Sequence, residues 1–438
     1  MKVFLTTILV AVALLNVDAQ QIPTVAPDQN KSILIMNGIA HIGNGELIDN
    51  SAIGFENGKI TMVADARVIR LAPDAYDTII DASGMHVYPG FIASNSTLGL
   101  VEIDMVRQSV DQTETGTYKP GIRSAISYNT DSEIIPTVRS NGVLMGQVTP
   151  RGGVISGTSS VMQFDAWNWE DAIIREDDGV HLNWPAVFHR HMEKGKLLIE
   201  KVKTYDQQLT EIQTFFREAR AYCNVKKPEI RELRFEGLRG IFEGTQTLYV
   251  HADDSKAITE AVNFKQAMSI DRMVVVGGYD AHYVAALLKE NDVPVMLYRV
   301  HDLPFFNEDD VDLPYKLPFM LYQAGVKFCL QNAGEMERMG TRNLPFYAGT
   351  AVGYGLPYEE AVRSITLSAA EILGIEKNCG SLEQGKDATL FISYGDALDM
   401  MTNNVKWAFI QGRQIDLSNK QTELYQKYKS KYDQERKK

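Results

Sequence analysis

The sequence predicts an α/β protein in which a parallel sheet or barrel is flanked by short β-strands from both ends of the chain. Two observations carry this prediction. Strand-like apolar runs and amphipathic helix-like segments alternate through the middle of the 438 residues, as parallel sheets require. Short apolar runs separated by glycine turns fill the chain before residue 88 and recur after residue 377, which is typical of hairpins.

The first 19 residues resemble a secretory signal peptide. Lys2 precedes an apolar run over 3–15, and Ala19 supplies the small residue before the expected cleavage point. A membrane anchor is the alternative, but the run is shorter than the roughly 20 apolar residues that a spanning helix needs. No later segment has enough apolar residues to span a membrane. We therefore expect export to the bacterial periplasm or cell envelope and a soluble mature chain.

Hairpin strands are expected at both ends of the mature chain, over residues 20–88 and 377–416. Asn-Gly pairs at 37–38 and 57–58 are turns of the kind that connect antiparallel strands. The apolar runs around these and other turns predict strands at 33–38, 52–60, 78–84, 389–392 and 407–410.

Strand and helix signals alternate over residues 89–376. One helix is indicated by apolar residues at helical spacing between 209 and 219, and two more are expected to begin at Pro228 and Pro357. Besides the run that begins at residue 89, strands are predicted at 143–148, 248–252, 273–276, 295–298 and 326–330. Because this count is below eight, we expect some barrel strands to be short, degenerate or absent.

Two segments, 101–136 and 151–184, do not fit a minimal barrel and are interpreted as insertions. Both follow the carboxyl ends of strands, where barrel proteins place functional loops. In the second segment an arginine and a glycine-rich backbone have the chemistry to bind an anion, and two tryptophans have the surface to stack on a ligand. The alternative is a loop that only closes the barrel mouth, with the tryptophans buried. The candidate ligand-binding residues here are Arg151, Ser156, Thr158, Trp167 and Trp169.

Composition and the remaining motifs exclude several classes of function. A net charge of −12 disfavours nucleic-acid binding. The sequence has no nucleophile elbow, phosphate-binding loop or dinucleotide-binding fingerprint. Of the three cysteines, Cys329 is expected in the core, and a disulfide between Cys223 and Cys379 stays open. The basic tail over 417–438 repeats apolar residues every four positions, which predicts a surface helix.

Two strings of residues resemble the amidohydrolase superfamily. Residues 89–99, PGFIASNSTLG, are similar to its first barrel strand, usually PGFIDxHxH, and residues 380–388, GSLEQGKDA, are similar to a structural signature. The resemblance extends over about 33–415 and favours the imidazolonepropionase- and prolidase-like secreted branch. It implies a (β/α)8-type, possibly degenerate TIM-like barrel over 89–376. It also implies a composite β-sandwich domain built from both termini.

The resemblance also marks the positions where the family has its metal ligands. At most of these positions this chain has a residue that does not ligate a metal well. The H-x-H spacing aims two side chains into the barrel mouth, but Asn95 and Thr97 occupy these positions, and their oxygens are poor zinc ligands. His251 matches the next histidine. Gly277 and Ala333 stand where a further histidine and the catalytic aspartate belong.

A rebuilt zinc or other divalent-metal site around His251 is the alternative to a buried, hydrogen-bonded histidine. The metal would need more ligands, because one histidine does not hold a catalytic zinc. Asn332 and Glu335 are in addition candidate ligand-binding residues. The possible further ligands are Asp253, Asn332, Glu335, His181, His189 and His191.

Three functions agree with these observations. We favour an exported pseudoenzyme with no cofactor, which binds a small molecule or forms a homo- or hetero-oligomer, the latter with a catalytically complete amidohydrolase. The second is a metal-dependent hydrolase of carbon–nitrogen bonds in cyclic amides or dipeptide-like substrates. The third is a structural component of an envelope assembly.

Overall fold

The computed structural model describes residues 25–70, 72, 74–193, 196–334 and 336–436. The predicted signal peptide over 1–19 and the candidate residue Glu335 lie outside this part of the chain. Among the described helices, none combines the length and apolarity that a membrane crossing requires.

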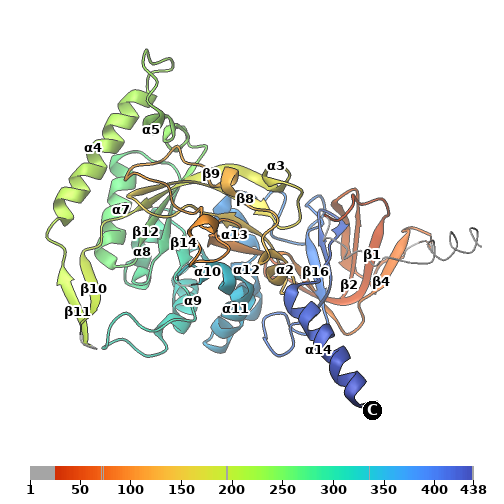
Figure 1. The fold of residues 1–438 in the computed structure, drawn as a ribbon. Coiled ribbons are helices and arrows are strands. Elements are labelled where there is room, and N and C mark those ends of the chain that lie inside the picture. The colour runs from red at the N-terminus through yellow and green to blue at the C-terminus, as the bar shows by residue number, and fades with distance from the viewer. Residues whose placement is uncertain (1–24, 71, 73, 194–195, 335, 437–438) are drawn as a thin grey trace, which may run out of the picture.

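Eight strands form a nearly closed barrel in the order β6-β7-β8-β9-β12-β13-β14-β15 (Figure 1). A parallel bridge between Ser94 and Gln331 brings the first and last strands together. This confirms the α/β barrel that the sequence predicted. The strands are β6 (Phe91–Ser96), β7 (Val143–Val148), β8 (Ile155–Gln163), β9 (Ile173–Asn183), β12 (Thr247–Ala252), β13 (Met273–Gly277), β14 (Val295–Leu297) and β15 (Phe328–Leu330).

The segment 151–184, which we interpreted as an insertion, supplies two of these barrel strands. β8 pairs antiparallel with both β7 and β9, so hairpin connections replace two of the usual crossover helices. All nine residues of β8 are buried although five of them are glycine, serine or threonine. The serine and threonine hydroxyls form hydrogen bonds with neighbouring strands and with the segment 101–136, which is why hydropathy did not mark a strand here. The other segment, 101–136, carries two short 3₁₀ helices and part of α2.

Helices cover the outside of the barrel. The helix predicted at 209–219 is confirmed as α4, which buries Ile212, Phe216 and Ala219. One helix was expected to begin at Pro228, but the structure has two short helices there, α5 and α6. The helix expected from Pro357 is likewise divided into α12 and α13. The helices are α2 (Ile135–Arg139), α3 (Trp169–Ala172), α4 (Tyr205–Cys223), α5 (Leu233–Glu236), α6 (Arg239–Phe242), α7 (Ser255–Ala267), α8 (Ala285–Glu290), α9 (Leu313–Ala324), α10 (Glu337–Gly340), α11 (Leu344–Gly353), α12 (Tyr358–Ser364) and α13 (Leu367–Leu373), with 3₁₀ turns at Arg107–Ser109, Ser124–Ser127, Ala281–Val284 and Thr341–Asn343.

A second, mixed sheet lies beside the barrel and combines strands from both ends of the chain (Figure 1). β5 and β16 join the two ends, because Pro89 pairs with Leu390 in antiparallel register. Its own apolar core includes Ile35, Ile53 and Phe409. The strands are β1 (Ile33–His41), β2 (Leu47–Glu56), β3 (Lys59–Asp65), β4 (Thr78–Asp81), β5 (His86–Pro89), β16 (Leu390–Ser393), β17 (Val405–Ile410) and β18 (Arg413–Gln414), and a separate hairpin is formed by β10 (Phe188–Glu193) and β11 (Lys196–Lys201).

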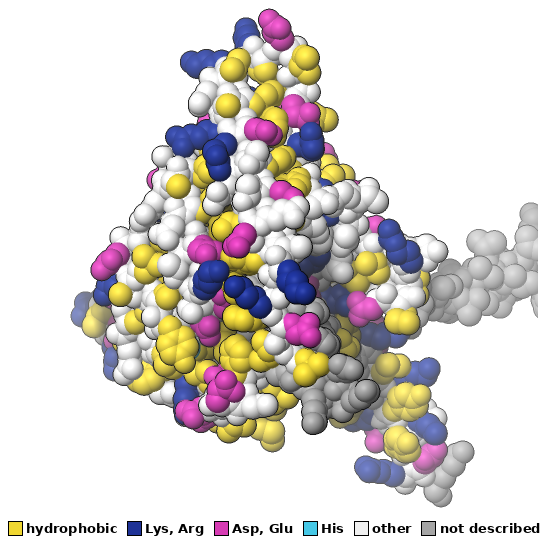
Figure 2. Space-filling view, turned by 90° about the vertical axis from the view of Figure 1, so that its left-hand side faces the viewer, with side chains coloured by type: hydrophobic (Ala, Val, Ile, Leu, Met, Phe, Trp, Pro, Cys, Tyr) yellow, Lys and Arg dark blue, Asp and Glu magenta, His cyan; other side chains and the backbone are white. Residues whose placement is uncertain are grey.

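The tail forms the expected surface helix, α14 (Lys420–Arg436), which buries none of its described residues and projects away from the body in Figure 1. Cys329 is buried as expected, and Cys223 and Cys379 are free, so the possible disulfide between them is not formed. On the face shown in Figure 2, basic and acidic side chains are interspersed, which is the usual pattern of a solvated surface.

Candidate functional site

A cavity of about 590 Å³ opens at the carboxyl ends of the barrel strands. The sequence-predicted residues Asn95, Thr97, His251, Ala333 and Arg151 all line it. Asn95 lies on β6 and Thr97 directly follows that strand, while His251 lies on β12. Ala333 and Arg151 lie on the loops that follow β15 and β7, respectively. Six residues that were not candidates from the sequence complete the lining of the cavity: Asp104, Gln112, Gly334, Met336, Glu337 and Arg338.

The Arg151 guanidinium is fixed at the mouth of the barrel. Its Nη1 donates to Oδ1 of Asn95 at 2.9 Å, and its Nη2 donates to the Asn95 carbonyl oxygen at 2.8 Å. The same Nη2 lies 3.0 and 3.1 Å from the two carboxylate oxygens of Glu337. A permanent positive charge is therefore held against Asn95, one of the positions that the sequence resemblance marks for a metal ligand.

Asn95 is constrained by several hydrogen bonds. Its backbone lies in the left-handed region, with φ of 50°, where residues other than glycine are uncommon. The backbone N–H donates to Gln147 at 3.1 Å, and the side-chain amide donates to Gln331 at 2.6 Å. Because its side-chain oxygen accepts from Arg151, this residue is engaged on every polar group and serves to position the guanidinium.

His251 is held neutral beside this cation. Burial and the nearby Arg151 guanidinium lower the pKa of His251 to about 3. Its Nε2 lies 2.9 Å from Nδ1 of His181, whereas its Nδ1 has no hydrogen-bond partner among the described residues. The neutral ring therefore has one nitrogen committed to the barrel interior and one available to a ligand in the cavity.

A buried polar network continues from His251 into the barrel. His181 Nε2 lies 2.9 Å from Oγ of Ser159, and this hydroxyl lies 2.8 Å from Oδ1 of Asp178. Oδ2 of Asp178 accepts from Gln147 at 2.8 Å and from Tyr249 at 2.6 Å. Burial raises the pKa of the Asp178 carboxyl and lowers that of His181. Ser159 and Asp178 were not candidates from the sequence, because no pattern showed that the segment 151–184 forms barrel strands whose polar side chains meet inside the barrel.

The residues at the family's metal positions do not fit a divalent cation. Within the described residues, no group of three or more His, Cys, Asp or Glu side chains is arranged to hold one. Gly277 has no side chain to offer as a ligand. A Cβ at this position would lie 2.3 Å from Oδ1 of Asp253, so there is no room for a side chain either. Asn95 is bonded to Arg151, and Nε2 of His251 to His181. Among the residues that the structure describes here, the remaining ligand atoms are too few and too weak for zinc.

The other candidate residues lie outside the cavity. Ser156 and Thr158 are buried on β8, where their hydroxyls bond to Asn183 and to the Pro120 carbonyl. Asn332 donates to the Glu337 carbonyl and accepts from the Tyr347 hydroxyl at 2.5 Å, which positions the start of α10, the helix that carries the Arg151 partner. Trp167 is 67% exposed on the surface, and Trp169 packs against the barrel core. His189 and His191 lie on the separate hairpin, away from His181 on β9.

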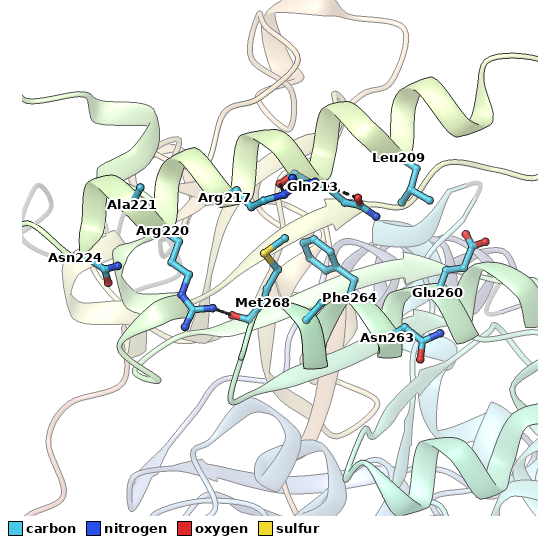
Figure 3. A pocket seen from close by; sticks show the side chains of 11 residues that line it. Leu209, Gln213, Arg217, Arg220, Ala221, Asn224, Glu260, Asn263, Phe264 and Met268 are labelled. Atoms are coloured by element: carbon cyan, nitrogen blue, oxygen red, sulfur yellow. Dashed lines mark hydrogen bonds between the residues drawn. The ribbon is translucent and has the colours of Figure 1, made fainter.

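A second cavity, of about 670 Å³, lies outside the barrel between α4 and α7 (Figure 3). Leu209, Phe264 and Met268 form its apolar lining, and Arg220 donates to the Met268 carbonyl at 2.7 Å. It contains none of the sequence-predicted site residues and lies on the outer layer of helices. We therefore take the smaller, polar barrel-mouth cavity as the candidate site, in the place where barrel proteins bind their ligands.

Comparisons with known proteins agree with this architecture. Residues 318–415 match the model of the amidohydrolase family. A search of curated proteins found no match. An amidohydrolase from Thermotoga maritima has 22% sequence identity and a TM-score of 0.75, with 88% of this chain and 99% of that chain covered.

Two further solved structures hold bound ligands. A Xaa-Pro dipeptidase with bound methionine has 15% identity and a TM-score of 0.50, covering 87% of this chain and 99% of that one. A prolidase complexed with N-methylphosphonate-L-proline has 15% identity and a TM-score of 0.51, covering 88% and 99%. At these identities the likeness concerns the fold.

Proposed function

We propose that this chain, an amidohydrolase-superfamily protein by its family match and fold, binds a small zwitterionic ligand of the dipeptide type without a divalent metal. The observation that carries the proposal is the guanidinium of Arg151, which is fixed at the barrel mouth beside the neutral ring of His251. Arginine binds carboxylates in a forked geometry and keeps its charge at all physiological pH values.

The charges around the cavity favour a zwitterion over a simple anion. Arg151 is paired with Glu337, and Arg338 is paired with Asp104 at 2.6 Å. A ligand carboxylate would approach the guanidinium groups, and a ligand ammonium would approach the carboxylates or Nδ1 of His251. The Xaa-Pro dipeptidase and the prolidase, whose structures hold an amino acid and a proline derivative, support the choice of dipeptides as probes.

Export and pairing with a catalytically complete amidohydrolase belong to the same proposal. A chain that binds the ligand of a family enzyme without its metal would deliver or sense that ligand in the envelope. The alternative is a metal-dependent hydrolase of carbon–nitrogen bonds with a site rebuilt around His251. A purely structural role in an envelope assembly would leave the cavity without a ligand.

The protein purified from its native envelope without chelator is expected to contain far less than one zinc or other divalent ion per chain. The reason is that Arg151 and His181 occupy the atoms that a metal would need. Elemental mass spectrometry gives the ratio, the N-terminal sequence of the same sample reports cleavage after Ala19, and co-eluting proteins report a partner. One tightly bound ion per chain would contradict the proposal and support the rebuilt hydrolase.

Replacing Arg151 with glutamine is expected to weaken binding of glycylproline at least about tenfold, which corresponds to about 1.4 kcal/mol. The substitution keeps a polar side chain and removes the charge that meets the ligand carboxylate. Isothermal titration calorimetry measures the affinity, with N-acetyl and C-amide forms of the dipeptide to identify which charged end each group recognises.

The matched control is Arg217→Gln, the same change at an arginine of α4 that lines the second cavity and not the barrel-mouth cavity, and it should leave the affinity unchanged. Equal affinities of wild type and Arg151→Gln would show that the guanidinium does not bind the ligand. No heat of binding for any of these dipeptides would reject the ligand class.

A further inference from the structure

Four buried or half-buried side chains form one continuous hydrogen-bonded chain from the cavity to the barrel interior. The contacts run from His251 Nε2 to His181 Nδ1 at 2.9 Å and from His181 Nε2 to Ser159 Oγ at 2.9 Å. The last runs from Ser159 Oγ to Asp178 Oδ1 at 2.8 Å. Nothing in the binding of a dipeptide requires such a chain beneath the cavity.

The direction of each hydrogen bond follows from the groups at the inner end. Gln147 accepts from the Asn95 N–H through its oxygen, so its amide nitrogen must donate to Asp178. Tyr249 and Ser159 also donate to this carboxyl, which therefore accepts three hydrogen bonds, the environment of a carboxylate.

The orientation of the two rings then follows by exclusion. The Ser159 hydroxyl has one hydrogen, and its two acceptors are Oδ1 of Asp178 at 2.8 Å and the more distant Gly179 carbonyl at 3.2 Å. It already accepts from the Gln147 amide at 3.1 Å, and with its hydrogen given to Asp178 it also accepts from His181, which places the His181 proton on Nε2. Nδ1 of His181 is then an acceptor, so His251 donates from Nε2. The remaining nitrogen of His251, Nδ1, presents a lone pair to the cavity.

We propose that this chain is a metal-independent general base, in which a proton taken from a ligand by Nδ1 of His251 is transferred through His181 and Ser159 to Asp178. His251 gains the ligand proton on Nδ1 and gives its Nε2 proton to Nδ1 of His181. His181 gives its Nε2 proton to Ser159, and Ser159 gives its own hydrogen to Oδ1 of Asp178. The ligand gains one negative charge, and the carboxylate loses one.

The relay explains how a histidine beside a cation can act as a base. A protonated His251 is disfavoured by burial and by Arg151, but in the relay both rings are neutral before and after the transfer. The charge that changes is on Asp178, whose burial raises the pKa of the carboxyl and makes it a better proton acceptor.

The location of Arg151 indicates the class of reaction. A proton removed from a ligand hydroxyl, or from the C–H beside a ligand carbonyl, leaves an oxyanion in the cavity that the guanidinium would stabilise. This is the charge that a metal ion stabilises in a metal hydrolase. The inference rests on the proposed function only in placing a ligand in this cavity, and its test uses the ligand-free protein, so the two fail separately.

The experiment is nitrogen-15 NMR of the full chain with labelled histidine rings, with His181→Gln and His251→Gln to assign the signals. At neutral pH both rings are expected to be neutral and protonated on Nε2. On acidification both are expected to change to the Nδ1-protonated form at one shared midpoint, because a single proton reaches Asp178. The charged and titratable groups that act on the chain during this change are Arg151 at His251, and Arg175 and Tyr249 at Asp178.

Ser159→Ala removes the link between the histidines and Asp178, so the shared change of the two rings is expected to be lost. The matched control is Ser160→Ala, its neighbour on β8, whose hydroxyl accepts from the Asp177 N–H and lies outside the chain. Asp178→Asn should abolish the change at every pH, and the serine variant keeps the test decisive if that protein does not fold. A doubly protonated ring, separate midpoints in the wild type, or an unchanged response in Ser159→Ala would overturn the relay.

Discussion

Replacing Asp165 with alanine is expected to lower the free energy of unfolding by about 3–5 kcal/mol, because it leaves two arginines buried without their counter-ion. The Asp165 carboxylate lies between Arg139 of α2 and Arg413 of β18, with N–O distances of 2.7 and 2.8 Å. The three side chains are only 4%, 9% and 10% exposed, respectively. The carboxylate also accepts from the Ala26 N–H, so it joins the barrel to both terminal segments.

Urea unfolding followed by circular dichroism measures this loss. The control is Asp310→Ala, which removes an ion pair with Lys316 from an exposed position and should cost about 0–1 kcal/mol. A loss for Asp165→Ala no greater than that of the control would mean that water reaches the two guanidinium groups when the carboxylate is absent.

The location of the site could be predicted from sequence because strand ends converge. Asn95, His251 and Ala333 are separated by about 80 to 160 residues in the chain, but each lies at or just beyond the carboxyl end of a recognisable apolar strand. Since the carboxyl ends of parallel barrel strands meet at one end, matching three strands was enough to place the three residues together. The same reasoning placed Arg151 nearby, as the first residues after β7 must lie at that end.

The chemistry of the site was harder to predict, because it depends on pairs of polar residues that no periodicity marks. Glu337 pairs with Arg151 although the two residues are 186 positions apart in the sequence. Glu337 lies on α10, a helix of only four residues. Ser159 and Asp178 are buried because their hydrogen bonds inside the barrel compensate the loss of water. Hydropathy treats such residues as exposed, so the strands β8 and β9 were read as a loop together with the groups that they carry.

The single helix that the sequence predicted from Pro357 is divided into α12 and α13 by local packing. The run expected from Pro357 to about Leu373 is interrupted at Ile365 and Thr366, where the Ile365 carbonyl accepts from the Ile92 N–H of β6. A carbonyl that accepts a hydrogen bond from a barrel strand is not free to accept the intrahelical hydrogen bond that would continue the helix. Apolar spacing continues across such a break, so the pattern alone could not locate it.

Replacing Phe391 with alanine is expected to cost about 3–5 kcal/mol of unfolding free energy, the range for removing a large buried aromatic side chain. The fully buried Phe391 ring lies on β16 with its centroid 4.9 Å from that of Phe91 and 5.3 Å from that of Tyr88. It also covers Gly142, where a Cβ would lie 2.5 Å from the ring. The side chain thus fills the space between the mixed sheet and the first two barrel strands.

The same unfolding measurement on Phe188→Ala provides the matched control, since this phenylalanine is 46% exposed on the separate hairpin and should cost far less. A loss at Phe391 that merely equals the loss at Phe188 would show that the neighbouring rings collapse into the space. A larger loss should affect the barrel as well as the mixed sheet, because Phe91 begins β6, the strand that carries Asn95 to the cavity. We therefore expect Phe391→Ala to weaken ligand binding without touching the site, by loosening the strand that positions the Arg151 guanidinium.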